Sequence, residues 1–435
     1  MTDPAVSIRT DRRLIRANGK STRFILARVT APAAQARATR SPVNLAIVLD
    51  RSGSMSGAKL ATAKLAVQEA IGHLLPTDRF SVVVYDDKVD VVIESTEATG
   101  EARHAAVRRL AEIEARGSTD LGGGWLRGCE QVAGHLMAQG VNRCLLLTDG
   151  LANVGITDPS ALSTHASELR ARGVSTSTFG VGNDFDERLL TDLADAGGGH
   201  FYYISDVAQI RDAITSEVGE TLEVVARDVS LEVLARDEIE VEPITPHKVT
   251  RRGGRTAVML GDLGSEQIVE VVLRLTFPYG TIGQDAGAIL TLTDRDGVFG
   301  SEAQARLAWE YADSQTNDHQ PRDRDVDRVV ARMFAARATQ EAVRLNREGD
   351  YRRASQLLAR TAARIREYAN GDPELLAIVD ELEARRRVME TPVPEYDRKQ
   401  MYYASSNLAR SRDPMGRSMK SADPSNRVQD PSKRV

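Results

Sequence analysis

The sequence predicts a doubly wound α/β domain with a mostly parallel six-stranded sheet, inserted in an antiparallel β-sandwich and followed by a C-terminal helical region. Between residues 43 and 222, short apolar runs alternate with helical patterns, which is typical of a parallel sheet. Between residues 223 and 312 the apolar residues recur with a period of two and turn signals separate the segments. From residue 326 the helical period returns. These three changes of period define the expected architecture.

Composition and charge restrict the classes of function. The chain has 435 residues, of which 41% are hydrophobic and 27% charged, as in globular proteins of two or three domains. A net charge of −5 argues against nucleic-acid binding. No run of about 18 apolar residues occurs, so we expect no membrane span. Two cysteines without metal-binding spacing and an N-terminus without an apolar signal-peptide core lead us to expect a cytoplasmic protein.

The N-terminal segment, residues 1–42, contains short alternating stretches such as Phe24–Val29 and then an Ala/Pro/Arg-rich connection. These strands are too few to bury a core of their own. We therefore expect them to complete the sheet of the later β-sandwich, with the α/β domain inserted between the two parts.

The α/β domain, residues 43–222, begins with an almost wholly apolar run, Val43–Asp50, which predicts a central strand buried on both faces. Residues 80–85 and 89–93 are separated by a short turn and predict a hairpin at the edge of the sheet. Further strands are expected at residues 143–150, 174–181 and 200–204. The expected helices are residues 59–75, 101–113, the segment after Gly124 through Leu136, 160–172, 187–194 and 207–222.

The rest of the chain divides into three predicted regions. Residues 223–312 form the β-sandwich, and residues 313–390 form a helical hairpin or bundle. One segment of the latter, 342–354, resembles a single tetratricopeptide-like helix–turn–helix, although one copy is equally typical of an ordinary helical hairpin. Residues 391–435 are polar and basic, with nine Lys/Arg and three Asp from residue 398 onward, which predicts a disordered tail.

Hard oxygen ligands gather where two of the buried strands end. Asp50, Ser52 and Ser54 follow the first strand, Thr119 lies in a glycine-rich loop, and Asp149 ends a second buried strand. If the two strands are neighbours, both aspartates lie at the same sheet edge, where open α/β sheets place their sites. Two carboxylates and three hydroxyls suit Mg²⁺, with Mn²⁺ or Ca²⁺ as alternatives, better than zinc. Such a metal keeps a position open for an incoming Asp or Glu carboxylate.

Each of these residues also has an ordinary structural interpretation. Asp50, Ser52 and Ser54 could be a helix cap and turn, Thr119 could cap the next helix, and Asp149 could belong to a simple strand end. Their combination favours the metal site. The neighbouring glycines lack the lysine and the spacing of a phosphate-binding loop. The sequence offers no nucleophile–His–acid set, so no catalytic residue is predicted.

The segment Asp50-Arg51-Ser52-Gly53-Ser54 matches the DxSxS motif of von Willebrand factor A domains, which are Rossmann-like. Thr119 and Asp149 fall where that family places the rest of its metal-ion-dependent adhesion site. The resemblance covers residues 43–222 and implies metal-binding roles for these five residues. The layout is also similar to inter-α-trypsin inhibitor heavy chains and to bacterial cytoplasmic A-domain proteins, which pair an A domain with β structure.

We therefore expect a non-enzymatic, metal-dependent protein-binding module or scaffold whose bound cation captures an acidic residue of a partner. One alternative that the resemblance implies is an adaptor working with a separate MoxR-type AAA+ ATPase in complex assembly. Another is a Mg²⁺-dependent phosphoryl hydrolase, although the loops offer Asp50 no acid–base partner except a second carboxylate.

Overall fold

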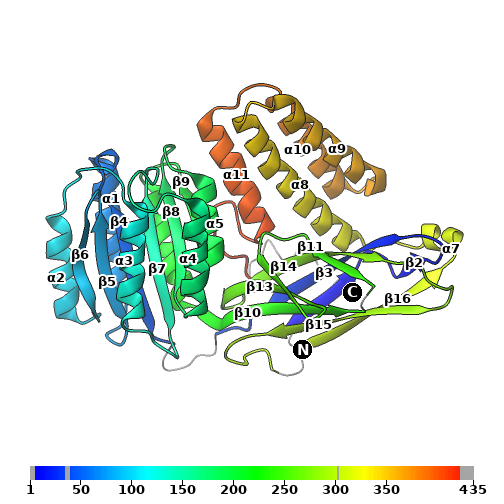
Figure 1. The fold of residues 1–435 in the computed structure, drawn as a ribbon, viewed down its shortest axis with the longest axis horizontal. Helices are drawn as coiled ribbons and strands as arrows, with labels where there is room; N and C mark the ends of the chain where they lie inside the picture. The colour runs from blue at the N-terminus through cyan, green and yellow to red at the C-terminus, as the bar shows by residue number, and fades with distance from the viewer. Residues whose placement is uncertain (1–4, 35–39, 237, 301–302, 422–435) are drawn as a thin grey trace. The chain divides into compact units, whose positions relative to one another are not determined.

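The computed structural model describes residues 5–34, 40–236, 238–300 and 303–421. The chain forms two compact units (Figure 1), of which one comprises residues 34–224 and the other comprises residues 1–33 together with 225–435. The first unit is the α/β domain. It is inserted in sequence between the strands of the second unit, as the sequence predicts.

The sheet of the α/β unit has the strand order β6-β5-β4-β7-β8-β9. All neighbours are parallel except the edge pair β5 and β6, which is antiparallel and is the predicted hairpin. β4 lies beside β7 with Leu49 opposite Leu147, so the two strands end at the same edge. The strands are β4 (Val43–Asp50), β5 (Arg79–Tyr85), β6 (Val89–Glu97), β7 (Val141–Thr148), β8 (Ser175–Val181) and β9 (Gly198–Ile204).

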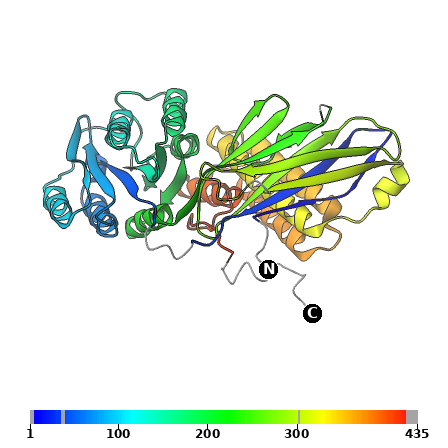
Figure 2. The ribbon, with the colours of Figure 1, turned by 90° about the horizontal axis from the view of Figure 1, so that it is seen from below.

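Helices cover both faces of this sheet (Figure 2), which is why all eight residues of β4 are buried. The helices are α1 (Ala58–Gly72), α2 (Gly100–Ala111), α3 (Leu121–Ala133), α4 (Pro159–Ala171), α5 (Glu187–Gly197) and α6 (Gln209–Leu222). Two predicted helix ends were too late, since α1 and α3 stop three residues short of Leu75 and Leu136. Both leucines are exposed and so gain nothing from continuing the helix against the core.

The second unit contains a β-sandwich with sheet orders β1-β3-β14-β11 and β12-β13-β10-β15-β16-β2. The N-terminal strands complete both sheets, because β3 pairs with β14 over its whole length and β2 pairs with β16. The strands are β1 (Val6–Thr10), β2 (Leu14–Arg16), β3 (Ser21–Thr30), β10 (Val224–Ala235), β11 (Glu240–Pro243), β12 (Lys248–Arg252), β13 (Arg255–Gly264), β14 (Ile268–Phe277), β15 (Asp285–Thr293) and β16 (Gln304–Ala312). Ile25, Leu231, Val271 and Trp309 are among the residues of its core.

Helices pack on the first of these sheets within the same unit. Leu26 and Val272 of the sheet share a core cluster with Val329 and Met333 of α8. The rings of Phe24 and Phe334 meet edge to face with centroids 5.7 Å apart. The helices are α7 (Ser314–His319), α8 (Arg324–Arg347), α9 (Tyr351–Ala369), α10 (Pro373–Val388) and α11 (Glu395–Ala409).

The prediction of a disordered tail from residue 391 is wrong for most of that segment. Residues 395–409 form α11, where Tyr403 is buried and Lys399 is only 1% exposed. Beyond the helix, Ile268 donates a backbone hydrogen bond to Met419 at 2.8 Å. The basic composition hid one face of small and aromatic residues that packs inside the unit. Residues 422–435, the end of the predicted tail, lie outside the described residues.

The described helices include none that is both long enough and apolar enough to cross a membrane.

Candidate metal centre

Strand β4 carries Asp50 to the carboxyl edge of the sheet, where its side chain is completely buried. Oδ1 accepts the Ser52 backbone N–H at 2.7 Å, and Oδ2 accepts the Thr148 hydroxyl at 2.7 Å. Burial raises the pKa of Asp50, the nearby charge of Asp149 adds to this, and the hydrogen bonds from Thr148 and Ser52 oppose it. Asp50 therefore fixes the start of the loop and ties it to strand β7.

Asp149 follows β7 and is fully buried at the same edge. Its Oδ1 accepts the Ser54 hydroxyl at 2.6 Å, and the Oγ atoms of Ser54 and Ser52 lie 3.1 Å apart. Its Oδ2 accepts the ammonium group of Lys59 at 2.5 Å. Hydrogen bonds between the side-chain oxygens of Ser52, Ser54 and Asp149 thus link the loop after β4 to the loop after β7.

Thr119 is buried in the loop that precedes α3. A β-carbon built on Gly150 would lie 3.6 Å from Thr119 Oγ1 and 4.0 Å from Ser54 Oγ, so the three loops meet beside that glycine. The Thr119 carbonyl accepts the backbone N–H groups of Asn153 and Val154 at 3.1 and 3.2 Å, which holds the threonine loop against the loop after β7. All five predicted ligands are therefore at one edge of the sheet.

Asp86, in the turn between β5 and β6, forms ion pairs with the loop after β4 and the loop before α3. Asp86 accepts Nε of Arg51 at 2.9 Å and Nε of Arg116 at 2.6 Å. Burial opposes ionisation, but the hydrogen bond from Arg116 and the charge of Arg51 hold the pKa of Asp86 below its ordinary value. Gly117 has φ +68°, and a β-carbon there would lie 2.1 Å from Asp87 Oδ1, so the turn requires glycine.

Three side chains that contact the predicted ligands or hold their loops escaped the sequence analysis: Thr148, Lys59 and Asp86. Thr148 directly precedes Asp149, and a hydroxyl at the end of a buried strand beside two aspartates was an available signal. Lys59 lies in the first turn of the helix that follows the loop, where its contact depends on the helix position rather than on a motif. Asp86 lies in the short turn between the two strands of the predicted hairpin.

The donor set fits a hard divalent cation. Two carboxylates and three hydroxyls supply oxygen atoms only, which is the chemistry of Mg²⁺, Mn²⁺ and Ca²⁺ sites. The ammonium nitrogen beside Asp149 Oδ2 also shows that a positive charge can be accommodated at this carboxylate. Metal binding by these residues remains a prediction.

Another acidic cluster, His200, Glu217 and Glu220, also has atoms close enough to share an ion. Glu217, however, is completely buried and already engaged, since Arg143 donates to Oε1 at 2.7 Å and Tyr202 donates to Oε2 at 2.7 Å. The adjacent arginine would repel a cation. We interpret this cluster as structural.

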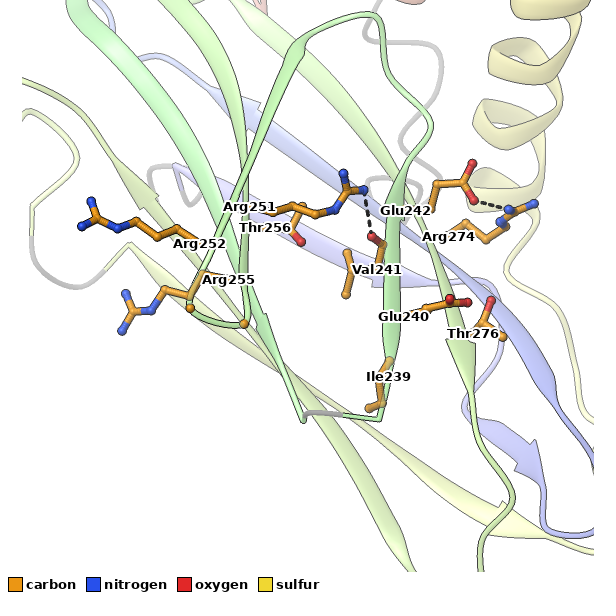
Figure 3. A pocket seen from close by; sticks show the side chains of 12 residues that line it. Ile239, Glu240, Val241, Glu242, Arg251, Arg252, Arg255, Thr256, Arg274 and Thr276 are labelled. Carbon is orange, nitrogen blue, oxygen red and sulfur yellow. Dashed lines mark hydrogen bonds and ion pairs between the residues drawn. The ribbon is translucent and has the colours of Figure 1, made fainter.

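The β-sandwich has a hollow of about 750 Å³ between β11 and the β12–β13 hairpin (Figure 3). Arg251 extends toward the Val241 carbonyl at 3.5 Å, and Arg274 pairs with Glu242. Arg252 and Arg255 point away from β11. The lining contains neither histidine nor cysteine and does not form a catalytic set.

Comparison with known proteins supports the fold. A solved von Willebrand factor type A protein from Catenulispora acidiphila superposes with a TM-score of 0.71 at 20% identity, covering 92% of this chain and 96% of that one. The ArnB paralog VWA2 from Sulfolobus acidocaldarius gives a TM-score of 0.55 at 17% identity, covering 89% of this chain and 99% of that one. At these identities the likeness concerns the fold alone. It extends over both units of the chain.

Two curated relatives match part of the chain. The uncharacterized protein YfbK of Escherichia coli is 32% identical over 192 residues, which are 44% of this chain and 33% of that protein. Inter alpha-trypsin inhibitor, heavy chain 4, of Mus musculus is 30% identical over 179 residues, which are 39% of this chain and 19% of that protein. The chain thus spans a third or less of the length of these two relatives.

The sequence model of the von Willebrand factor type A domain matches residues 44–216. Domains of this type are commonly metal-dependent protein–protein interaction modules that bind a divalent metal at their adhesion site. The match covers the whole sheet from β4 to β9 and the loops that carry the five predicted ligands. The chain thus contains a von Willebrand factor type A domain, which the family model places at residues 44–216.

Proposed function

We propose that the chain is a non-enzymatic binding protein in which a divalent cation, Mg²⁺ in the first place, captures an acidic residue of a partner protein. Asp50, Ser52, Ser54, Thr119 and Asp149 hold the cation. The observation that carries the proposal is the burial gradient at the sheet edge: Asp50 and Asp149 are fully buried, whereas Ser54, which is bonded to Asp149, is exposed. The cluster therefore reaches solvent on one side.

The coordination number explains why a partner would complete the site. The two carboxylates balance the charge of a divalent ion, and the three hydroxyls are neutral. Mg²⁺ prefers about six oxygens in octahedral geometry and fills the remaining positions with water or an outside ligand. A carboxylate from another protein can take such a position in place of water.

An enzymatic role for the same site has less support. Asp50 is completely buried, and hydrogen bonds from Ser52 and Thr148 orient both of its oxygens, so this carboxylate is held away from solvent water. None of the residues placed in contact with the five predicted ligands is a histidine or a cysteine. We therefore favour binding over phosphoryl hydrolysis.

Affinity capture from a lysate with the purified chain as bait tests the proposal. Ser54→Ala removes one ligand at an exposed position, so the fold should remain intact. Ser56→Ala is the matched control, because Ser56 is an exposed serine of the same loop outside the predicted ligand set. Proteins that are retained in Mg²⁺ by the wild type and by Ser56→Ala, but lost in EDTA and with Ser54→Ala, are ligands of the site.

Capture that survives both EDTA and Ser54→Ala would contradict the mechanism. An AAA+ ATPase recovered in the metal-dependent fraction would make the chain an adaptor. Magnesium-dependent phosphatase activity that Ser54→Ala abolishes would instead establish the hydrolase.

A further inference from the structure

Lys59 lies in the first turn of α1 and reaches back into the candidate metal centre. Its ammonium nitrogen lies 2.5 Å from Asp149 Oδ2 and 3.4 Å from the Ser54 carbonyl oxygen. Asp149 is completely buried, whereas the Lys59 side chain is 27% exposed. The lysine is thus a positive charge that covers the solvent side of a predicted ligand.

We propose that Lys59 is a tethered cation that occupies the place of the divalent ion at Asp149 and is displaced when the ion binds. The inference rests on the proposed function and adds a regulator to the same site. Lys59 lowers the affinity for the ion and, by pairing with Asp149, keeps the domain stable without it.

The bonding of Asp149 identifies the lysine as the group that must leave. Oδ1 is bonded to the Ser54 hydroxyl and Oδ2 to Lys59, so both oxygens are engaged. A hydroxyl retains lone pairs and can turn from hydrogen-bond donor to metal ligand. An ammonium group has no lone pair and repels a divalent cation at close range. Only the lysine competes directly with the ion.

The structure leaves the lysine a route out of the site. Its side chain is already partly exposed, and a β-carbon built on Gly182 would meet only Lys59 Nζ and Cε within 4 Å, so no other side chain closes the space beside that glycine. Once displaced, the ammonium group remains tethered near the exposed Ser54. That is the side from which a partner carboxylate would approach, and the freed charge would attract it.

Calorimetric titration of the purified full-length chain with Mn²⁺ tests the inference. Lys59→Met keeps much of the side-chain length and removes the charge. Because an ion pair to a buried carboxylate no longer has to be broken, Mn²⁺ should bind at least about tenfold more tightly. Lys59→Arg, which retains the charge, should bind like the wild type.

Lys64→Met is the matched control. Lys64 is on the same helix, and its ammonium group is bonded to the backbone carbonyls of Ala111 and Ile113 instead of to the site. This variant loses the same charge and should leave the Mn²⁺ affinity unchanged within about twofold. An equal gain in Lys59→Met and Lys64→Met would show a general charge effect and overturn the proposal.

Thermal unfolding gives a second readout. In EDTA, Lys59→Met should melt at a lower temperature than the wild type, because Asp149 then lacks its counter-charge, and Mn²⁺ should raise its melting temperature by more. If Lys59→Met does not fold, Lys59→Gln replaces it in both measurements. Binding of Mn²⁺ by the variant alone would also support the inference.

The outcomes separate this inference from the proposed function. Equal Mn²⁺ affinity for the wild type and Lys59→Met, with metal-dependent capture of a partner intact, overturns the role of Lys59 only. Absence of Mn²⁺ binding by both proteins overturns the metal centre and the lysine together.

Discussion

Strand β7 has a buried charge at each end, and the two ends are built differently. Near its start, Arg143 and Glu217 form an ion pair in which the two side chains are 1% and 0% exposed. After its end, Asp149 is equally buried but depends on Ser54, which is exposed, and on Lys59, which is partly so. The first charge is paired with a buried arginine, whereas the second has partners that reach the solvent.

Glu217 uses all its acceptor positions inside the domain. Its Oε1 accepts Arg143 and, at 2.6 Å, the Ser177 hydroxyl, while its Oε2 accepts Tyr202 and lies 3.2 Å from His200 Nδ1. The difference teaches that burial alone does not distinguish a structural charge from a functional one. The exposure of the partners does.

Loss of the Glu217 carboxylate should have the largest effect on the free energy of unfolding. Glu217→Ala leaves Arg143 buried without a counter-charge, and we expect the free energy of unfolding to fall by about 3–5 kcal/mol. Urea denaturation followed by circular dichroism measures it. Asp212→Ala, an exposed position of the same helix, should cost less than about 0.5 kcal/mol. A loss below about 1 kcal/mol in Glu217→Ala would show that the pair is not structural.

At the other end of β7, where Asp149 lies, bound metal should change the free energy of unfolding. At a Mg²⁺ concentration of about 100 times its Kd, the free energy of unfolding should rise by about 2.7 kcal/mol, because the ion binds the folded state. EDTA should reverse the gain, and Ser54→Ala should reduce it. An equal rise in the wild type and in Ser54→Ala would place the bound ion elsewhere in the chain.

The sequence was sufficient for much of the site because its geometry follows from strand order. Asp50 and Asp149 each follow an apolar run, and adjacent parallel strands bring such ends together. The contact of Thr148 with Asp50 follows from the same strand pairing, because Leu49 lies opposite Leu147. The contact of Lys59 was not predictable in this way, since it depends on the direction in which α1 starts.

In the fold, too, some elements could be predicted from the sequence and others could not. The central strands of the α/β unit are long, fully buried and mostly apolar, so the sequence pattern was sufficient to predict them. Strands β11 and β12 have four and five residues and contain no fully buried residue, so their pattern was too weak to detect. Helix α11 was missed because its buried face includes Lys399 and several serines, which average composition assigns to a polar tail.

The smallest expected effect is a difference in pH dependence between the two ends of β7. The charges of Arg143 and His200 hold the pKa of Glu217 well below its ordinary value of 4.5, against the effect of burial. A lowered pKa in the folded state contributes stability above the unfolded pKa, and this contribution is lost as the pH falls from there toward the folded value.

Glu217→Gln removes this contribution and retains the size of the side chain. Between pH 6 and pH 4, the wild type should therefore lose more unfolding free energy than Glu217→Gln, by a few tenths of a kcal/mol to about 1 kcal/mol. Urea titrations in EDTA at both pH values measure the two slopes without any contribution from a bound ion. Ser54→Ala should keep the wild-type slope, since it changes no charge. Parallel slopes for the wild type and Glu217→Gln would mean that the Glu217 carboxylate is not the acid-sensitive group of this domain.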